Sequence, residues 1–423
     1  MPAVDRNPAL SRRAFLRAAA GVAALPFAGG LLDACTGAAP VTPRVSVPTL
    51  PRPDRPVTWP VHEDLTLADG LAPERGVTLK VFEWRRYLSA DVLRSFEQKY
   101  AGVRVEATSF ESRDEAAAKL AQPGADYDVF FPTVDQIGDL VGARLLRPLN
   151  HSYLPNVANL WTPFSASGSP FYDVNLGYTI PYTVFSTGIG WRADLLPRTA
   201  DPEAHAYDAF WRAGVRTKVG LYANYREALG MALLRDGVGD VNTVDPSVIA
   251  RAADALATLA RSVPLELTGE GYEDLPNGSL AIAQAWSGDM LSARRFGHAD
   301  RLGTTAELRY LWPSGGVVGC DLTAVCANGR NPVLAHAFLD HLLDEDVALQ
   351  NFSWNGYQPP VNAALPQAFA DPRFPYRDIV PANLRGALLS PEDFTGGRML
   401  LGLDPAGDAA WQRAWGSVSA ATA

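Results

Sequence analysis

The chain has 423 residues, 47% of them hydrophobic, a balance typical of a globular protein and not of a disordered one. Its formal net charge of −9 argues against nucleic acid or an anionic membrane surface as a partner, because both repel an acidic protein. The three cysteines are too few and too widely spaced for a disulfide scaffold or a zinc site.

The first thirty-five residues have the pattern of an export signal. The pair Arg12-Arg13 precedes an apolar run at 18–32, which is shorter than the roughly 20 residues that a membrane-spanning helix needs. Paired arginines are typical of twin-arginine export, and Leu32-Asp33-Ala34-Cys35 resembles a lipobox. We therefore predict a signal peptide at 1–34 and a lipid anchor on Cys35. Removal of the signal peptide takes away four arginines and two aspartates, so the net charge of the mature protein becomes −11.

A proline-rich linker is predicted at 35–76. Seven prolines lie between residues 36 and 60, and proline lacks the backbone N–H that helices and sheets require. In the polyproline conformation such a segment extends by about 3.1 Å per residue, which would hold a folded body away from a membrane. The folded domain is expected to begin near Val77.

Strand and helix patterns alternate from Val77 onward. This alternation indicates β-α-β units and an α/β fold with doubly wound sheets. The segment 177–190 breaks the rhythm with Pro181 inside a β-branched stretch, as expected of a strand that crosses between two lobes. Before it, we predict strands at 78–82, 103–107 and 127–131 and helices at 89–100, 114–120 and 135–146.

The second half of the chain continues the α/β pattern. Cys320 and Cys326 fall in one predicted strand, about 20 Å apart, which is too far for a disulfide, so we expect two buried thiols. The end of the chain, from Asp371, is expected to be helical and rich in loops. Before it, we predict helices at 225–235, 246–261 and 331–352 and strands at 280–286, 307–312 and 320–327.

The signatures of common enzymes are absent from the sequence. It contains no Gly-x-Ser-x-Gly elbow, no Gly-Lys-Ser/Thr phosphate loop and no His-Glu-x-x-His motif. His336 and His341 are five residues apart on a predicted helix, so they diverge and do not share a metal-binding face. We expect structural or surface roles for all six histidines, and no catalytic residue, cofactor or metal.

Aromatic and acidic residues gather instead at the predicted strand ends and in loops. In an open parallel sheet, ligands bind at the carboxyl ends of the strands. Ring faces there attract ammonium groups by roughly 0.5–2 kcal/mol each, and carboxylates pair with them through charge-assisted hydrogen bonds. Such a site fits an alkyl polyamine or a similar organic cation. The residues are Trp84, Tyr87, Asp135, Tyr222, Asn224, Tyr225, Glu227, Trp286, Asp321 and Tyr357.

A series of short motifs lies in collinear order between about Val77 and Ala364. It comprises Val81-Phe82-Glu83-Trp84-Arg85-Arg86-Tyr87, Phe110-Glu111-Ser112, Tyr127-Asp128-Val129-Phe130-Phe131-Pro132-Thr133, Thr179-Ile180-Pro181-Tyr182, Arg226-Glu227, Ala285-Trp286-Ser287-Gly288 and Gly356-Tyr357-Gln358-Pro359. Together these motifs resemble those of the bacterial spermidine/putrescine-binding proteins, the solute-binding components of polyamine ABC transporters.

The resemblance implies a set of binding residues. Trp84, Tyr87, Trp286 and Tyr357 would line the cleft between two lobes. Carboxylates would meet the nitrogens of the ligand and a hydroxyl would complete the site; these groups belong to Glu227, Asp321 and Thr133.

Four positions depart from the family pattern. Arg85 stands where polyamine binders have a small polar residue, Asp135 replaces an aromatic residue, Asn224 an aspartate and Gly319 a tryptophan. Arg85 would repel a polyamine unless it pairs with Asp135 or points outward. These departures bear on the identity of the ligand and leave the fold unaffected.

The resemblance also implies the architecture and the function. We expect a two-lobed periplasmic-binding-protein fold of type II-like topology, each lobe a doubly wound sheet with flanking helices. Lobe 1 would comprise 77–182 and about 319–357, and lobe 2 would comprise 183–318 and about 358–423. The protein would be an exported, lipid-anchored monomer, in a periplasm or on the outer face of the cytoplasmic membrane. It would capture a polyamine by hinge closure and deliver it to a permease, without catalysing a reaction.

Three alternatives stay open. The same fold would bind a zwitterionic or anionic solute, such as an amino acid derivative or an organophosphonate, if Arg85 selects the ligand. An exported cofactor enzyme would also explain the arginine pair, because twin-arginine export often carries such enzymes, although no cofactor motif is present. A sensory or structural lipoprotein with the same fold is the third.

Overall fold

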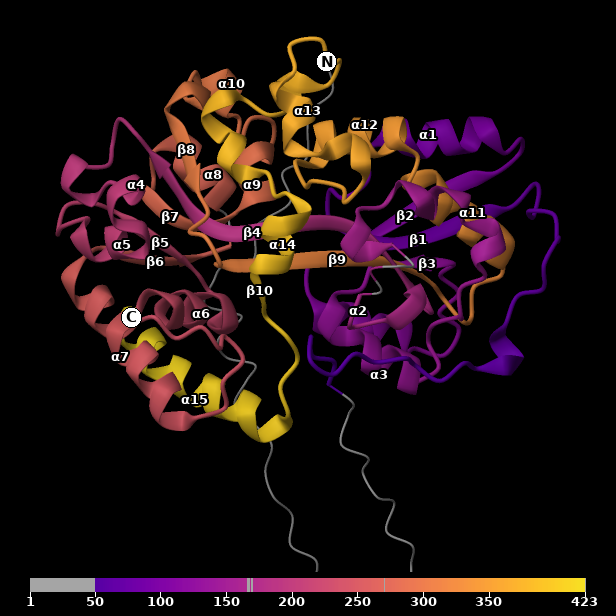
Figure 1. Ribbon diagram of the computed structural model, residues 1–423, viewed down its shortest axis with the longest axis horizontal. Helices are drawn as coiled ribbons and strands as arrows, with labels where there is room; N and C mark the ends of the chain where they lie inside the picture. Colours follow the sequence, from indigo (N-terminus) through magenta and orange to yellow (C-terminus); the bar gives the residue numbers. More distant parts are fainter. Residues whose placement is uncertain (1–49, 166–167, 169, 270, 423) are drawn as a thin grey trace, which may run out of the picture. The chain divides into compact units, whose positions relative to one another are not determined.

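The computed structural model describes residues 50–165, 168, 170–269 and 271–422. All of them belong to one structural unit, drawn in colour in Figure 1. The predicted signal peptide at 1–34, Cys35 and the predicted linker up to residue 49 lie outside the described residues.

One mixed sheet organises this unit. Its strands follow the order β2-β1-β3-β9-β4-β7-β5-β6, with β8 paired to β4 and β10 to β9. Strands β1 to β3, here called the first half of the sheet, are parallel, as are β5 to β7, the second half. Between them lie β4 and β9, which are antiparallel to each other. The strands are β1 (Thr78–Trp84), β2 (Arg104–Phe110), β3 (Val129–Phe130), β4 (Thr179–Arg192), β5 (Val219–Tyr222), β6 (Leu265–Thr268), β7 (Ile282–Trp286), β8 (Leu308–Leu311), β9 (Val317–Val325) and β10 (Arg398–Met399).

Helices flank both halves of the sheet (Figure 1), which confirms the predicted α/β fold. The first of them begins as predicted, because the Ser89 hydroxyl accepts a hydrogen bond from Val92 N–H at 3.1 Å. The helices are α1 (Ala90–Lys99), α2 (Arg113–Leu120), α3 (Ile137–Gly142), α4 (Pro202–His205), α5 (Ala209–Arg212), α6 (Tyr225–Arg235), α7 (Pro246–Ser262), α8 (Gly271–Asn277), α9 (Ser287–Ser292), α10 (Ala299–Leu302), α11 (Pro332–Leu342), α12 (Glu345–Asn355), α13 (Pro366–Ala370), α14 (Pro391–Gly396) and α15 (Pro405–Thr422).

The long helix predicted at 331–352 is two helices, α11 and α12. Asp344 between them has an extended backbone, and its carboxylate accepts a hydrogen bond from Val347 N–H at 3.2 Å. Aspartate is a strong N-cap residue, so the chain ends one helix and starts the next there. The continuous apolar pattern concealed this break, because both helices pack on the same core.

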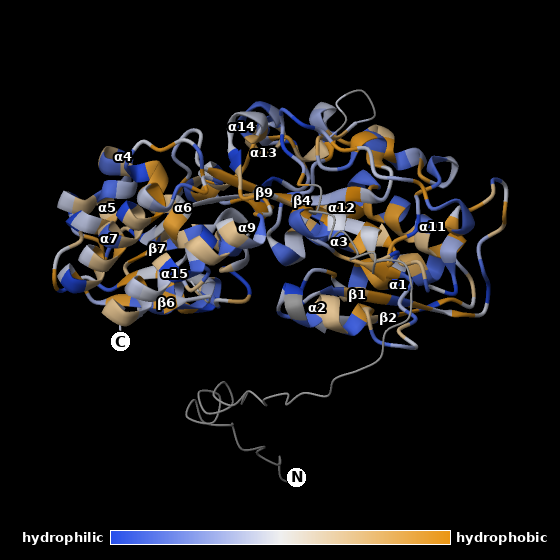
Figure 2. Ribbon diagram, turned by 90° about the horizontal axis from the view of Figure 1, so that it is seen from below, coloured by the Kyte–Doolittle hydropathy of each residue, from blue (hydrophilic) through white to orange (hydrophobic). Residues whose placement is uncertain are grey.

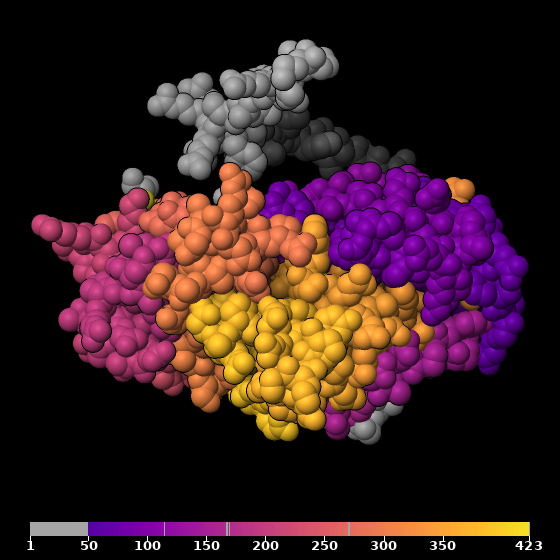
Figure 3. All heavy atoms as spheres, turned by 90° about the horizontal axis from the view of Figure 1, so that it is seen from above, coloured from indigo at the N-terminus to yellow at the C-terminus, as the bar shows by residue number. Residues whose placement is uncertain are grey.

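Hydrophobic residues concentrate on the strands, and hydrophilic residues on the outer faces of the helices (Figure 2). Strands buried on both faces are typical of parallel sheets covered by helices. Figure 3 shows one face of the unit, on which the C-terminal segments, in orange and yellow, lie between the N-terminal segments and those from the middle of the chain.

The segment 50–76, predicted as part of a free linker, packs on the folded unit instead. Val57 and Trp59 are buried. The backbone N–H of Val57 donates to Phe171 O at 2.8 Å, and the Trp59 indole N–H donates to Tyr172 O at 2.9 Å. Burial of these two apolar side chains makes the packed conformation of the segment more stable than an extended one in water. The folded part therefore begins well before Val77.

The buried thiols and histidines agree with the sequence analysis. Cys320 and Cys326 are both buried and free. His336 is fully buried and accepts a hydrogen bond from Asn150 N–H at 3.0 Å, and His341 is 5% exposed. Both histidines therefore have structural roles.

Candidate functional site

The ends of the parallel strands place several rings side by side. Strands β5 and β7 are parallel, so Tyr222 and Trp286 end them at the same edge of the sheet. Their rings stack with centroids 4.3 Å apart, and the Tyr222 hydroxyl accepts a hydrogen bond from Trp286 N–H at 2.6 Å. Tyr87 follows the end of β1.

A contiguous aromatic cluster joins these strand ends. Phe185 lies 6.1 Å from Trp286 and 5.9 Å from Tyr357, measured between ring centroids, with the rings edge to face. Tyr357 in turn lies 5.5 Å from Tyr87. Below, the aromatic cluster denotes Tyr87, Phe185, Tyr222, Trp286 and Tyr357.

Three buried carboxyl groups are each held by a ring of this cluster. The Tyr87 hydroxyl donates to Asp321 at 2.5 Å. The Tyr357 hydroxyl donates to Asp289 at 2.8 Å, and the Trp286 indole N–H donates to Glu227 at 3.1 Å. The three residues, called the cluster carboxyls below, are 6%, 9% and 7% exposed, respectively.

The cluster carboxyls have no ion-pair partner among the described residues. Burial raises the pKa of Asp289 to about 7 and that of Asp321 to about 6, and it also raises the pKa of Glu227. The hydrogen bonds from the rings offset part of this effect. A buried carboxylate without a cation is costly, so a ligand with positive charges would lower the free energy of the ionised site.

The other predicted residues of the first half of the sheet have partners of their own. The Trp84 ring packs on Phe110, with centroids 4.5 Å apart. Arg85 lies 3.4 Å from a carboxylate oxygen of Glu111, and its side chain is 50% exposed. Arg85 therefore points outward and does not pair with Asp135.

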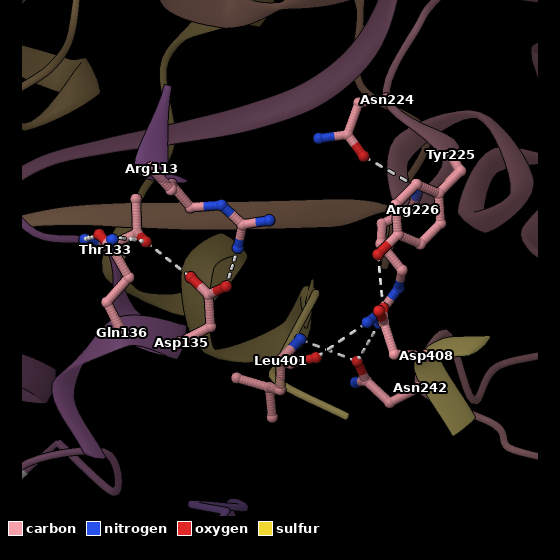
Figure 4. Close-up of polar contacts among 10 residues, drawn as sticks. All are labelled: Arg113, Thr133, Asp135, Gln136, Asn224, Tyr225, Arg226, Asn242, Leu401 and Asp408. Atoms are coloured by element: carbon pink, nitrogen blue, oxygen red, sulfur yellow. Dashed lines mark hydrogen bonds and ion pairs between the residues drawn. The ribbon is translucent and has the colours of Figure 1, made fainter. Parts of the chain in front are cut away.

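Asp135 forms an ion pair with Arg113 and accepts a hydrogen bond from the Thr133 hydroxyl at 2.6 Å (Figure 4). The backbone of Thr133 bridges to that of Asp321, so Thr133 adjoins one cluster carboxyl. Asp135 has its negative charge compensated within the protein, which distinguishes it from the cluster carboxyls.

Asn224 caps helix α6 by accepting a hydrogen bond from Arg226 N–H at 2.9 Å (Figure 4). Arg226 donates to Asn242 and Leu401 and lies over the Trp411 ring at 4.5 Å. Burial lowers the pKa of Arg226 to about 10. This motif thus positions the start of α6, on which Glu227 lies.

The structure brings together five of the ten predicted ligand-binding residues: Tyr87, Glu227, Trp286, Asp321 and Tyr357. Asp289 and Phe185, which the sequence analysis missed, contact the same cluster. Asp289 lies in the first turn of α9, where an acidic residue is common for helix stability alone. Its position three residues after Trp286, a predicted ligand-binding residue, was the one sequence feature that placed Asp289 near the site.

Two cavities of about 300 Å³, one beside Arg398 and one beside Trp354, are lined by residues other than the cluster carboxyls. In the part of the chain that the structure describes, no group of three or more histidine, cysteine or acidic residues is placed to hold a metal ion. Among the helices of that part, none combines the length and the apolar character needed to cross a membrane.

The α/β fold, with two strands joining the halves of one sheet, is that of the periplasmic binding proteins. Residues 91–375 match the model of the bacterial extracellular solute-binding proteins, and the chain belongs to this family. It is therefore a solute-binding protein of an ABC transporter and not an enzyme.

Relatives with known names support this assignment. The chain is 28% identical to the putrescine/cadaverine-binding protein of Pseudomonas aeruginosa over 295 residues, which cover 68% of this chain and 80% of that protein. A solved spermidine/putrescine transporter substrate-binding protein from Streptococcus pneumoniae superimposes with a TM-score of 0.67 at 21% identity, over 82% of this chain and 99% of that one. A lipoprotein of Treponema pallidum has a TM-score of 0.63 at 19% identity, over 81% and 99%.

Proposed function

We propose that the protein captures a polyamine, such as putrescine, cadaverine or spermidine, and delivers it to the permease of its transporter. The observation that carries this proposal is the set of three buried carboxyls, each held by a ring and none paired with a cation among the described residues. Ammonium groups pair with carboxylates and with ring faces. The names of the relatives from Pseudomonas aeruginosa and Streptococcus pneumoniae support the same class of ligand.

The proposed mechanism is closure around the ligand. Tyr87 follows β1 in the first half of the sheet, whereas Glu227, Trp286 and Asp289 belong to elements of the second half. A diamine held by both sets would draw the two halves together, with β4 and β9 as the connection. We propose lobes at 77–182 with about 319–357, on which the segment 50–76 packs through Val57 and Trp59, and at 183–318 with about 358–423.

Calorimetric titration of the purified protein tests the class of ligand. Putrescine and 4-aminobutyrate both have four carbons, but one terminal aminomethyl group of putrescine is a carboxylate in 4-aminobutyrate. We expect putrescine, cadaverine or spermidine to bind at least about 100-fold more tightly than 4-aminobutyrate, because a carboxylate would face buried carboxyls. Tighter binding of the zwitterion or of an organophosphonate would overturn the proposal.

Arg85→Ser is expected to change the affinity for putrescine by less than about threefold. The Arg85 side chain is half exposed and lies beside Glu111, and exposed charges contribute little to binding. Titration of the variant checks this. A tenfold or larger gain would mean that Arg85 repels the ligand from within the site, and a loss of anion binding would favour the zwitterionic or anionic solute.

We also propose that twin-arginine export and a lipid on Cys35 place the protein at the membrane. The signal pattern supports this, as does the lipoprotein of Treponema pallidum with the same fold. In the native host, the wild type is expected in the membrane fraction and Cys35→Ser in the soluble fraction. Equal recovery of both from the soluble fraction would exclude the anchor.

A further inference from the structure

Strands β4 and β9 each contain a single residue that is not fully buried. All fourteen residues of β4 are buried except Phe185, which is half-buried. All nine residues of β9 are buried except Gly319. These two positions face each other in the register of the strand pair. A large apolar ring and a glycine therefore occupy the one register position at which both strands are partly exposed.

The ring of Phe185 lies directly over Gly319. A Cβ atom added at Gly319 would be 2.3 Å from Cζ of Phe185 and 2.6 Å and 2.9 Å from its two Cε atoms. Such distances are shorter than any van der Waals contact, so a side chain at 319 would displace the ring. Glycine in a strand often marks a place where another group approaches closely, and here that group is the Phe185 ring.

Phe185 differs chemically from the other rings of the aromatic cluster. Those four rings carry an O–H or N–H group, and each of them makes a hydrogen bond. Phe185 has no polar atom. It contacts both Trp286 and Tyr357 edge to face, and these two rings hold Glu227 and Asp289. The apolar ring of Phe185 thus lies between two rings that each donate a hydrogen bond to a carboxyl group.

We propose that Phe185, seated over Gly319, is a specificity-determining residue that receives the hydrocarbon spacer between the charged ends of the ligand. This inference rests on the proposed function, because it presupposes a dication whose ends meet the cluster carboxyls. The spacer of a diamine consists of methylene groups, which gain by leaving water for an apolar surface. A spacer with a polar atom would lose its hydrogen bonds to water on the Phe185 ring without replacement.

Two matched ligands test the proposal. Cadaverine and bis(2-aminoethyl) ether have spacers of five atoms and charged amines at both ends, and they differ by an ether oxygen in place of the central methylene. We expect the wild type to bind cadaverine about tenfold more tightly than the ether. In Phe185→Asn this preference is expected to fall below about twofold, because the amide can hydrogen-bond to the ether oxygen or to water beside it.

Transposing the pair keeps the test decisive if single variants lose stability. In F185A/G319F the phenylalanine ring is attached to β9 instead of β4. The preference of this variant for cadaverine over the ether is expected to lie within about threefold of that of the wild type. Phe374→Ala is the control, since Phe374 is a half-buried phenylalanine that packs on Phe369, outside the cluster. It is expected to leave both affinities unchanged.

The outcomes separate this inference from the proposed function. If none of putrescine, cadaverine and spermidine binds the wild type, the proposed function fails. If cadaverine binds but Phe185→Asn keeps the wild-type preference, Phe185 does not contact the spacer and this inference is wrong. Loss of the preference in Phe374→Ala to the same extent would also overturn it, because the effect would then be one of general stability.

Discussion

Asp321→Asn is expected to weaken the binding of putrescine by at least about 30-fold. Asp321 is 6% exposed and has no cation partner among the described residues, so its charge is available to a ligand ammonium group. Removing one partner of a buried charge pair costs about 2–5 kcal/mol in protein complexes, and each 1.4 kcal/mol is a factor of ten. Asparagine has nearly the same shape and can still accept the hydrogen bond from Tyr87. Calorimetric titration gives both affinities.

Asp135→Asn is the matched control for this variant. Asp135 is also an acidic residue of the predicted site, but it pairs with Arg113, so its charge is compensated without a ligand. We expect its replacement to change the affinity for putrescine by less than about threefold. Equal losses in both variants would mean that the ligand senses the total charge of the region. An unchanged affinity in Asp321→Asn would remove Asp321 from the site.

The affinity for a diamine is expected to fall by about two orders of magnitude between pH 8 and pH 5.5. The pKa of Asp289 is raised to about 7 and that of Asp321 to about 6. At pH 8 both carboxyls are ionised and pair with ammonium groups, whereas at pH 5.5 both are mostly protonated. The amines stay charged over this range, because their own pKa values lie near 10. Titrations at several pH values measure the dependence.

Proton release provides an independent check. Near pH 6.5, binding of a dication should ionise carboxyls that were partly protonated, and the released protons appear as a dependence of the binding heat on the ionisation enthalpy of the buffer. Asp289→Asn should release fewer protons than the wild type. Binding that is independent of pH, with no proton release, would show that these carboxyls do not meet the ligand.

The stability of the ligand-free protein has the opposite dependence on pH. Folding raises the pKa of Asp289 from its ordinary 3.8 to about 7, so the folded state holds a proton that the unfolded state has lost. This contribution to stability is fully present below about pH 4 and is lost as the pH rises to about 7. The site is thus least stable under the conditions in which it binds a dication best.

The sequence predicted most of the fold because strands and helices carry local signals. The period of apolar residues located the strands, and the side chain of Ser89 marked a helix start. The segment 50–76 was misjudged because proline density outweighed two isolated apolar residues, Val57 and Trp59. Their burial depends on partners such as Tyr172, more than a hundred residues away, and no local pattern contains that information.

The site was predictable only in part, for a related reason. Trp286 ends β7 and Tyr87 follows the end of β1, where a parallel sheet collects ligand-binding groups. Asp321 lies in the middle of β9, and the family resemblance assigned it to the site. Phe185 lies inside a strand that reads as fully buried, and its exposure depends on the glycine opposite it in another strand. Cross-strand register is a tertiary property, so the pair becomes visible only once β4 and β9 are aligned.

The joined strands also bear on how the protein moves. Hydrogen bonds connect neighbouring strands from β2 to β6 through β9 and β4, so a movement of one half against the other has to bend these two strands. The register of their pairing shifts between Pro181 and Thr183, where proline cannot donate a hydrogen bond. Bending stiffness along a sheet is lowest where its ladder is interrupted. This irregularity adjoins the site, because Thr183 pairs with Asp321 and its hydroxyl donates to the Asp321 carboxylate at 3.4 Å. The proposed closure would therefore bend the strand pair beside a cluster carboxyl.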